Sequence, residues 1–593
     1  MKLLRLKITD PAGFRGLPCG FEHHFRTEWS LQDELAQPDG FAPFVCAGPN
    51  GSGKSNLLEA LAAIFFQLEI LRVRRSFLPE ALQNTGQDFS PVAFNLDYLI
   101  RIPNEYRGSD SPEWAKVGVW KNPGESVRFQ WENQSDFETD VYEMSNRDHA
   151  DILLPQYVLG YSSGENEILS LPFFKMRFVQ FDEYWTALVK QLPYSGRPDA
   201  RLAYLDSGFS QAILLCNLLF QDEATFQLFR EDIGIEELKE FRILIRRSIP
   251  LTPQQVEVFT SDNYAQPGYA QEEYFSENAS IGLDTATGGH RLELLSGLEG
   301  DERTSVIEKL KRCATLHFYD KITDTLILDY WVNERTKDAF RNNFDGSALS
   351  LFQALQVLLT LNLYSVSEVL KTDLYTSASH YVSETVPVLA SDQRIMRFKF
   401  VRFTKQGVAQ PMMLKELSDG EHQLLHSLGL CLLFRETNSL FLLDEPETHF
   451  NPDWRANFIT RLRQCLPGNG EFAQEMLITT HTPFLISDSK PDKVLVFAKD
   501  KTTGAVSIRH PDYNTLGASI NKITMNTFGK RETIGSHAQA LMGALRARFE
   551  EGDEDKESLI TEIHQQLGDS VEKVLLIKAI LDADRTGNGE VQD

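Results

Sequence analysis

The sequence contains no long uninterrupted apolar run, no close pair of cysteines and no excess of basic residues. A helix that spans a bilayer needs about 20 apolar residues. We expect no apolar run of this sequence to form a helix of that length. Residues 1–7 alternate charged and apolar side chains, whereas a signal peptide needs an unbroken apolar stretch. We therefore expect a cytoplasmic chain that does not enter a membrane.

Cysteine and positive charge are scarce. The six cysteines among 593 residues are far apart and never in C-x-x-C spacing, which favours buried free thiols over disulfides or a zinc site. Acidic residues number 84 and basic residues 59, so the formal net charge is −25. This balance argues against a surface that coats nucleic acid, although a local basic groove stays open. The basic group Arg72, Arg74 and Arg75 is interpreted as a solvated charged face.

What the chain does have is a complete phosphate-binding loop. The loop follows a strand-like apolar run, 41–47, and opens a segment, 57–65, with the apolar spacing of a helix. Glycines let backbone N–H groups curl around an anion at the start of such a helix. Lys54 is predicted to reach the β- and γ-phosphates of a nucleoside triphosphate, and the Ser55 hydroxyl to bind Mg²⁺. The pattern G-x-x-x-x-G-K-[ST] is matched by Gly48, Pro49, Asn50, Gly51, Ser52, Gly53, Lys54 and Ser55, and Asn56 follows them.

A second motif lies far along the chain. Residues 440–443 form an apolar run typical of a buried parallel strand, and Asp444 and Glu445 follow it directly. The carboxyl end of such a strand is where α/β sheets bind ligands. Asp444 is predicted to hold Mg²⁺, and Glu445 to orient the attacking water as a general base.

Two further segments flank this motif. Ser418, Gly420 and Glu421 precede an apolar helical pattern, and Ser418 and Glu421 have the spacing of a capping box. One interpretation is a well-capped helix start; the other is an anion site made by the Ser418 hydroxyl and the Gly420 N–H. Downstream, the apolar run 476–480 ends at His481, which is placed to contact a γ-phosphate oxygen.

These four motifs, in this order, resemble those of the ABC-type ATPases. The resemblance implies an α/β head that binds ATP and Mg²⁺ and hydrolyses ATP to ADP and phosphate. It also implies a head-to-tail dimer with two nucleotides between its copies. Ser418, Gly420 and Glu421 would then act in trans on the nucleotide of the second copy, with Glu445 as the base and His481 as the switch histidine.

The interval from Lys54 to Ser418 is much longer than in a compact transporter-type domain. A large insertion therefore splits the head, and in this the chain resembles the SMC and RecF-like branch, as it does in its Gly13-Phe14-Arg15-Gly16 element. The insertion lacks sustained heptads, so no coiled-coil arm is expected. Its predicted elements are helices at 207–220 and 350–369, strands at 240–247 and 325–332, and a surface loop at 261–289.

A polar turn follows the predicted strand at 157–161. Its position is that of the Q-loop, which in the ABC family couples the γ-phosphate to the rest of the head. Gln156 or Asn166 is the candidate coupling residue, and a plain β-turn is the alternative. The sequence leaves these interpretations open.

The C-terminal region lacks the acidic residues of a Toprim nuclease. The strand-like run 493–497 ends without the glutamate that such a domain needs. Helical patterns at 536–549 and 559–581 are predicted instead, with an exposed acidic linker at 550–557. We interpret this tail as a docking module.

As a whole, the chain resembles the stand-alone AAA/ABC ATPases of bacterial defence loci. The armless insertion, the segments 161–167 and 445–452 and the tail are most similar to the PtuA-type ATPases of Septu and retron systems and to restriction-system-associated ATPases. This resemblance implies a regulatory ATPase that gates a separate nuclease of the HNH type, with nucleic acid engaged through the complex. The alternatives are a RecF-like repair ATPase that binds DNA directly and a nucleotide-binding scaffold with little turnover.

The expected architecture is thus an α/β P-loop head with a mixed core sheet and flanking helices, split by an α+β insertion and followed by a helical tail. The length favours two to four domains. The predicted boundaries are 1–190 for the first half of the head, 191–385 for the insertion, 386–515 for the second half and 516–593 for the tail.

Overall fold

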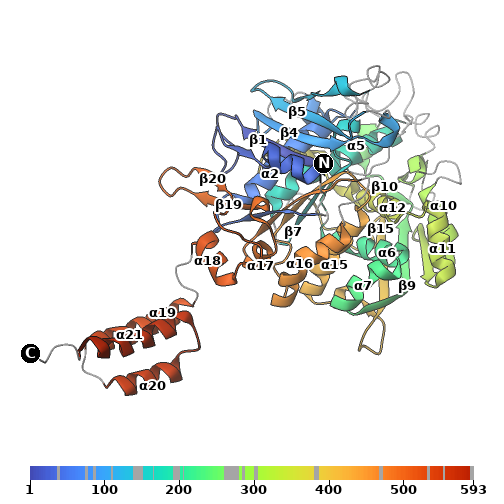
Figure 1. Cartoon of the computed structure of the whole chain (residues 1–593). Coiled ribbons are helices and arrows are strands. Elements are labelled where there is room, and N and C mark those ends of the chain that lie inside the picture. The colour runs from blue at the N-terminus through green and yellow to red at the C-terminus, as the bar shows by residue number, and fades with distance from the viewer. Residues whose placement is uncertain are drawn as a thin grey trace, which may run out of the picture. The chain divides into compact units, whose positions relative to one another are not determined.

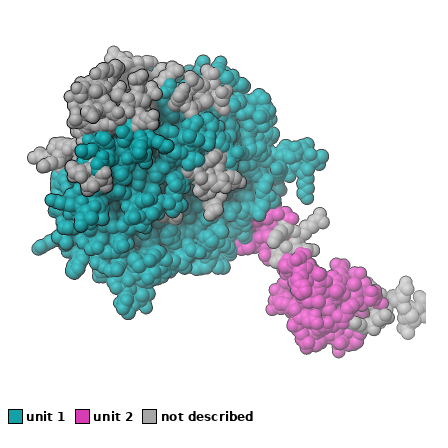
Figure 2. All heavy atoms as spheres, turned by 180° about the vertical axis from the view of Figure 1, so that it is seen from behind, with its two compact units in different colours: residues 1–516 teal, residues 517–593 magenta. Residues whose placement is uncertain are grey.

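The computed structural model is shown in Figure 1. Its described residues divide into two compact units, Met1–Leu516 and Gly517–Asp593 (Figure 2). Each unit buries its own apolar core. The structure describes residues 1–593 except 37–40, 74–77, 84–88, 108–110, 138–150, 164–165, 191–200, 205, 260–279, 284–287, 299–304, 380–385, 467–471, 530–533, 552–554 and 588–593.

A seven-stranded sheet forms the centre of the first unit. Its strand order is β20-β19-β3-β18-β17-β7-β8, and every neighbouring pair is parallel except the one with the edge strand β20. The middle strands are buried throughout, which is why their sequences are unbroken apolar runs. The strands are β3 (Phe44–Ala47), β7 (Tyr157–Ser162), β8 (Leu202–Tyr204), β17 (Ser439–Asp444), β18 (Glu475–Thr480), β19 (Val494–Lys499) and β20 (Val506–Arg509).

Two antiparallel sheets of five strands accompany this core. The first has the order β2-β1-β4-β5-β6, and the second, which we call the insertion sheet, has the order β13-β14-β9-β15-β16. A small third sheet pairs β10 (Ser248–Pro250) and β11 (Ile281–Leu283) with β12 (His290–Glu293). The strands of the larger sheets are β1 (Lys2–Ile8), β2 (Glu22–His24), β4 (Phe94–Arg101), β5 (Trp114–Lys121), β6 (Arg128–Trp131), β9 (Ile235–Arg246), β13 (Leu316–Asp320), β14 (Thr325–Trp331), β15 (Met396–Lys405) and β16 (Met412–Met413).

Helices surround the sheets. Helix α2 starts at the P-loop lysine and runs beside α5, and both are largely buried. Helices α6, α12 and α15 contact one another and connect the insertion sheet to the core. The longer helices of this unit are α1 (Glu28–Ala36), α2 (Lys54–Ile70), α5 (Glu167–Val189), α6 (Ser210–Phe220), α7 (Glu223–Asp232), α8 (Pro253–Phe259), α10 (Val306–Cys313), α11 (Glu334–Asn343), α12 (Ala348–Thr360), α13 (Glu368–Thr376), α15 (Asp419–Leu433) and α16 (Pro452–Cys465).

The sheets do not divide where the sequence placed its boundaries. Strand β8 follows residue 190 but joins the core sheet beside β7. Strand β15 follows residue 386 but pairs with β9 in the insertion sheet. The insertion therefore shares strands with the head: β8 forms an edge of the core sheet, and β15 lies between β9 and β16 in the insertion sheet.

The apolar segment 350–369 is not one helix, as predicted, but two. Helix α12 ends at Thr360, a 3₁₀ turn covers Leu361–Ser365, and α13 begins at Glu368 behind its Ser367 cap. Ala348–Ser365 is long and apolar enough to cross a bilayer, which corrects the expectation that no run reaches that length, but 56% of this window is buried inside the protein. We interpret it as a core helix.

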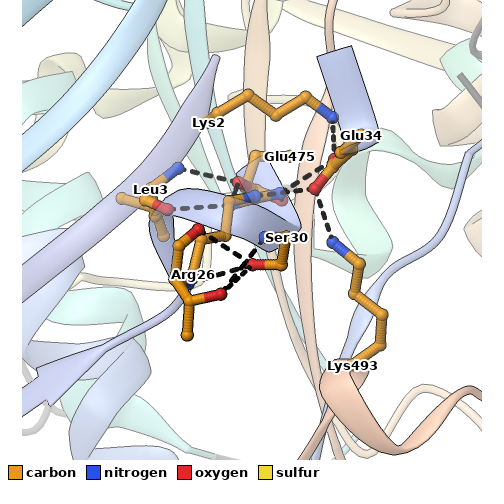
Figure 3. Close-up of polar contacts among 8 residues, drawn as sticks. Lys2, Leu3, Arg26, Ser30, Glu34, Glu475 and Lys493 are labelled. Atoms are coloured by element: carbon orange, nitrogen blue, oxygen red, sulfur yellow. Dashed lines mark hydrogen bonds and ion pairs between the residues drawn. The ribbon is translucent and has the colours of Figure 1, made fainter. Parts of the chain in front are cut away.

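A buried ionic cluster connects the chain's first strand to the core sheet (Figure 3). The Arg26 guanidinium, 1% exposed, donates to Glu475 on β18 at 2.6 Å and to Glu34 on α1 at 2.8 Å. Lys2 and Lys493 also pair with Glu34. The cluster joins β1, α1, β18 and the 3₁₀ turn Pro491–Lys493 before β19, so it fixes the first antiparallel sheet to the core sheet.

The second unit is a small helical module. It contains α18 (Ile520–Phe528), α19 (Ser536–Glu551), α20 (Lys556–Gln566) and α21 (Val571–Gly587). The predicted helix at 559–581 is in fact α20 and α21, separated by a break at 567–570 that contains Gly568. The core of the module is formed by Leu545, Leu559, Ile563, Leu567, Leu576 and Ile580.

Candidate nucleotide-binding site

The P-loop connects β3 to α2, as predicted. Its crown, Pro49 to Gly51, is exposed, whereas Ser52 and Lys54 are buried. Gly48 and Gly53 have φ values of 147° and 97°, which favour glycine. A Cβ on Gly48 would also lie 2.5 Å from the Phe497 carbonyl oxygen. The loop conformation therefore requires glycine at these two positions.

Asn56, which was predicted to bind nucleotide, faces away from the loop. Its side-chain oxygen accepts from the Gly16 N–H at 3.1 Å, and its amide donates to Glu59 at 3.2 Å. Asn56 therefore holds the Phe14-Arg15-Gly16 element against α2. This is a positioning contact that the motif alone does not reveal.

The two predicted magnesium ligands are in direct contact. The Ser55 hydroxyl donates to Asp444 Oδ1 at 2.9 Å. Thr479 at the end of β18 donates to the same oxygen at 2.5 Å, and Asn166 donates to Oδ2 at 2.7 Å. A hydroxyl and a carboxylate are hard oxygen ligands of the kind Mg²⁺ takes alongside phosphate oxygens. These residues therefore fit a magnesium ion. The buried Ser52 hydroxyl, which has no hydrogen-bond partner among the described residues, is a further polar group in the loop.

Glu445, His481 and Lys54 form a continuous chain of contacts. His481 Nε2 lies 2.9 Å from Glu445 Oε1 and 3.0 Å from Lys54 Nζ. The hydrogen bond from His481 lowers the pKa of Glu445, so its carboxylate is ionised at neutral pH. Burial lowers the pKa of Lys54. Motifs more than 390 positions apart thus meet at the carboxyl ends of β17 and β18, beside the P-loop.

The backbone of Glu445 is unusual. Its φ of 49° lies in the left-handed region, and its N–H donates to Thr479 Oγ1 at 3.0 Å. A non-glycine residue in this conformation carries strain that the surroundings must hold. Thr479, which the sequence interpretation did not single out, fixes the Asp444 carboxylate and the Glu445 backbone N–H. Its place at a strand end before His481 was the available signal.

Lys54 is engaged within its own loop. Its ammonium donates to the carbonyl oxygens of Gly48 and Pro49, each at 3.2 Å. These carbonyl oxygens accept from the Lys54 N–H groups that would otherwise donate to phosphate. Binding of a triphosphate thus requires Lys54 to exchange carbonyl oxygens for phosphate oxygens.

Of the two candidate coupling residues, only Asn166 reaches the site. It caps α5 by accepting from Leu169 N–H and donates to Asp444. Gln156 lies at the other end of β7, where its oxygen accepts from the Asn438 N–H at 2.8 Å. Gly164 and Glu165, between them in the turn, lie outside the described residues.

Asn166→Ala should weaken the response of ATP turnover to Mg²⁺. A residue that orients a metal ligand typically contributes about 10–100-fold to metal affinity or activity. Turnover titrated with Mg²⁺ measures this. Gln156→Ala, just before the opposite end of β7, is the matched control. Equal shifts in the two variants would contradict a coupling role for Asn166.

The predicted signature segment is exposed at the start of α15. Ser418 and Glu421 form the expected capping box, with Ser418 N–H and Oγ both 2.9 Å from Glu421 Oε2. Glu421 also pairs with Lys405, so its charge serves its own helix start. Gly420 packs so closely that a Cβ would lie 2.7 Å from the His449 carbonyl oxygen. Ser418 itself is accessible to another molecule.

Behind Glu445 the chain buries a second acid. Glu447 is 3% exposed, accepts a hydrogen bond from the Thr480 hydroxyl, and burial raises its pKa to about 7. Gln423 on α15 accepts from the His449 N–H at 3.0 Å. These contacts connect the segment after Glu445 to both the His481 strand and the signature helix.

The wild type should lose stability as pH rises from 5 to 8, and Glu447→Gln should not show this loss. The folded-state pKa is raised, so the stabilising contribution is complete below the ordinary value of 4.5 and disappears as pH rises through about 7. Each pKa unit corresponds to about 1.4 kcal/mol. Chemical denaturation at both pH values measures the effect, and an equal pH-dependent loss in the wild type and the variant would contradict it.

A cavity of ≈ 160 Å³ lies next to this site but is not part of it. Phe14, Arg15 and the α2 residues Glu59 and Phe66 line it, together with Lys175 of α5. No residue of the P-loop lines it.

Comparison with known proteins covers part of the chain. Residues 318–487 match a family model described as "AAA domain, putative AbiEii toxin, Type IV TA system". This region includes Asp444, Glu445, His481 and the signature segment. Together with the strand order and the P-loop geometry, the match decides the fold. The fold is that of a P-loop ATPase head.

Solved structures of SMC heads are similar at low identity. The SMC head bound to the C-winged helix domain of ScpA is 10% identical with a TM-score of 0.32, covering 86% of this chain and 97% of that one. The SMC head domain from Thermotoga maritima is 11% identical with a TM-score of 0.28, covering 86% and 100%. The Pyrococcus yayanosii head with coiled coil and joint is 11% identical with a TM-score of 0.27, covering 86% and 96%. No curated protein matches the chain.

Proposed function

We propose that the chain is an ATPase that binds ATP and Mg²⁺ between two of its own copies and uses hydrolysis to gate a separate nuclease. The observation that carries this proposal is the contact chain Ser55–Asp444 and Glu445–His481–Lys54 at one edge of the core sheet. It supplies groups for the metal, the water and the phosphates at one place. Such positioning and charge stabilisation account for most of phosphoryl-transfer catalysis.

Each residue of the site has a definable task. Lys54 and the N–H groups of the loop would bind the β- and γ-phosphates. Ser55 and Asp444 would hold Mg²⁺, which would supply positive charge to neutralise the charge that develops on the phosphates. The ionised Glu445 carboxylate accepts a proton from the attacking water. His481, between Glu445 and Lys54, orients the carboxylate and faces the γ-phosphate.

The second copy would complete the pocket. The crown of the P-loop is exposed, so a nucleotide bound there is open to water on one side. The accessible Ser418 hydroxyl and the Gly420 N–H begin a helix, where unpaired N–H groups favour an anion. In a head-to-tail dimer they would cover the γ-phosphate of the opposite copy.

A regulatory rather than nucleolytic role is supported by the rest of the chain. Within the described residues, no group of three His, Cys, Asp or Glu side chains could hold a metal ion. We expect the nuclease, of the HNH type, to be a separate subunit. We infer a role in bacterial, cytoplasmic anti-phage defence of the PtuA, Septu, retron or restriction-associated kind, and the matching family model's description as a toxin of a toxin–antitoxin system is compatible with it.

The purified chain tests this proposal. It should hydrolyse ATP slowly in Mg²⁺ and leave DNA intact until the nuclease encoded beside it is added. DNA cleavage by this chain alone, persisting in Glu445→Gln, would contradict the regulatory assignment.

A further inference from the structure

Among the described residues, nothing packs over one face of the insertion sheet. In the second half of β9, burial alternates: Phe241, Ile243 and Ile245 are buried, whereas Arg242 and Leu244 are partly exposed. The buried side packs toward α6 and α7, which contact β9. We call the opposite side, which carries Arg242 and Leu244, the open face.

Strand register places the side chains of the open face in rows. In antiparallel pairs, directly opposite residues share a face. One row contains Leu316, Asp329, Arg242 and Phe400, and the next contains Phe318, Ile327, Leu244 and Arg397. A third row, on the far side of the first, contains Trp331, Glu240 and Arg402. The last row, beside Phe318, contains Asp320, Thr325 and Arg246.

Large rings on this face are exposed to solvent. Trp331 is 68% exposed and Phe318 is 59% exposed, although both are side chains that normally gain free energy by burial. Phe400 lies between two guanidiniums, with Arg402 Cζ 4.6 Å and Arg242 Cζ 5.5 Å from its ring centroid. Rings and cations thus alternate across a flat surface.

The charges on this face favour an anion. Two arginines are neutralised: Arg242 by Asp329 at 2.8 Å and Arg402 by Glu240 at 2.5 Å. Asp320 is turned into its own loop, where it accepts from the Ile322 N–H and the Thr323 hydroxyl. Positive charge remains, because Arg246 and Arg397 have no carboxylate partner among the described residues. The same holds for Lys399, which is exposed in the β-bulge of β15 beside Phe400, in a chain whose net charge is −25.

We propose that the open face of the insertion sheet binds single-stranded nucleic acid. Bases would stack on Trp331 and Phe318, and Arg246, Arg397 and Lys399 would contact the phosphates. Open sheets with exposed aromatic residues recognise unpaired bases in this way, since every base presents a π-face. A protein partner would also cover the exposed rings. The core of a protein–protein interface is, however, depleted in charged residues. The three cations without a carboxylate partner therefore favour nucleic acid over a protein.

This site goes beyond the ATPase function proposed above and does not depend on it. The rows lie on β9, β13, β14 and β15, not on the strands that hold Asp444 and His481. Binding should therefore survive Lys54→Ala, which removes phosphate binding at the P-loop. Loss of oligonucleotide binding and loss of ATP turnover are then separable failures.

Fluorescence anisotropy of the full chain with labelled oligothymidylate and oligouridylate of about 16 nucleotides tests the proposal. Both probes should bind, and their affinity should fall as salt rises from about 50 to 200 mM. Tighter binding of one probe identifies DNA or RNA as the source. No anisotropy change with either probe at low salt would overturn the proposal.

Matched variants locate the site. Trp331→Ala with Phe318→Ala should weaken binding by about tenfold or more, since each stacked base contributes about 1–3 kcal/mol. Trp29→Ala, at a position 79% exposed on α1, is the control and should bind as the wild type does. Arg397→Glu should weaken binding further at low salt, and the same charge change in Arg546→Glu should not.

Two outcomes would assign the face differently. Wild-type affinity in the Trp331/Phe318 double variant would remove the face from any nucleic-acid site. Sedimentation that shows nucleotide-independent self-association, lost in the same double variant while neither probe binds the wild type, would make the face an interface between copies of this chain.

Discussion

Replacing Glu445 with glutamine should lower ATP turnover by about 10²–10⁴-fold, the usual contribution of a positioned general base. The amide keeps the size of the carboxylate but cannot accept the proton of the attacking water. ATP binding should persist, because Lys54 and the P-loop are unchanged. Steady-state phosphate release and nucleotide binding by filter assay measure the two quantities.

Glu447→Gln is the matched control for this experiment. It makes the same chemical change two residues away, at a carboxyl that bonds Thr480 rather than His481. Its turnover should stay within a few-fold of the wild type at pH 7. Full activity in Glu445→Gln would remove Glu445 from the role of base, whatever the stability of the variants.

Breaking the buried ionic cluster should have the largest effect on stability. Glu475→Leu leaves the Arg26 guanidinium, 1% exposed, without its partner on β18. Removing one member of a buried pair costs about 3–5 kcal/mol, because the remaining charge stays desolvated. Urea unfolding of the unit Met1–Leu516 measures this loss of unfolding free energy. Arg26→Met combined with Glu475→Leu should recover part of it.

Lys7→Met supplies the surface comparison. Lys7 and Glu22 form a pair at 2.9 Å whose side chains are 35% and 30% exposed, and such pairs contribute about 0–1 kcal/mol. A loss from Glu475→Leu as small as that from Lys7→Met would contradict a stabilising role for the cluster.

The cluster also predicts how the stability of the protein falls at acid pH. Arg26 lowers the pKa of Glu475 below its ordinary value of 4.5 in the folded protein. A depressed carboxyl pKa stabilises the folded state above the unfolded pKa and loses this contribution as pH falls toward the folded value. The wild type should thus lose stability below about pH 4.5 more steeply than the double variant.

Local patterns predicted the residues of the candidate site because each motif lies at the end of a single strand or the start of a single helix. Continuous apolar runs gave β3, β17 and β18, and the polar residues that end them gave Lys54, Asp444 and His481. Since parallel strands end at one edge, their tips had to meet. The contacts of Thr479, Glu447 and Asn56 depend on tertiary packing, which no spacing in the chain expresses.

Other features were beyond a local pattern for identifiable reasons. The apolar spacing of 350–369 continues across the 3₁₀ turn at Leu361, so periodicity alone could not show the break. The break between α20 and α21 has only Gly568 and its neighbours as a signal. The sheets that β8 and β15 join are set by pairing with strands distant in the sequence, which a local pattern does not show. The basic residues Arg74 and Arg75 and most of the loop 261–289 lie outside the described residues.

The most direct test of shared nucleotide sites is complementation between two inactive variants. Lys54→Ala removes the lysine proposed to bind phosphate, and Ser418→Arg blocks the signature surface proposed to face the other copy. If each pocket is built from two molecules, neither variant hydrolyses ATP alone, yet a mixture regains about a quarter of wild-type turnover, because half of the random dimers carry one intact pocket. A mixture as inactive as its components, or full activity of Ser418→Arg alone, would contradict the model.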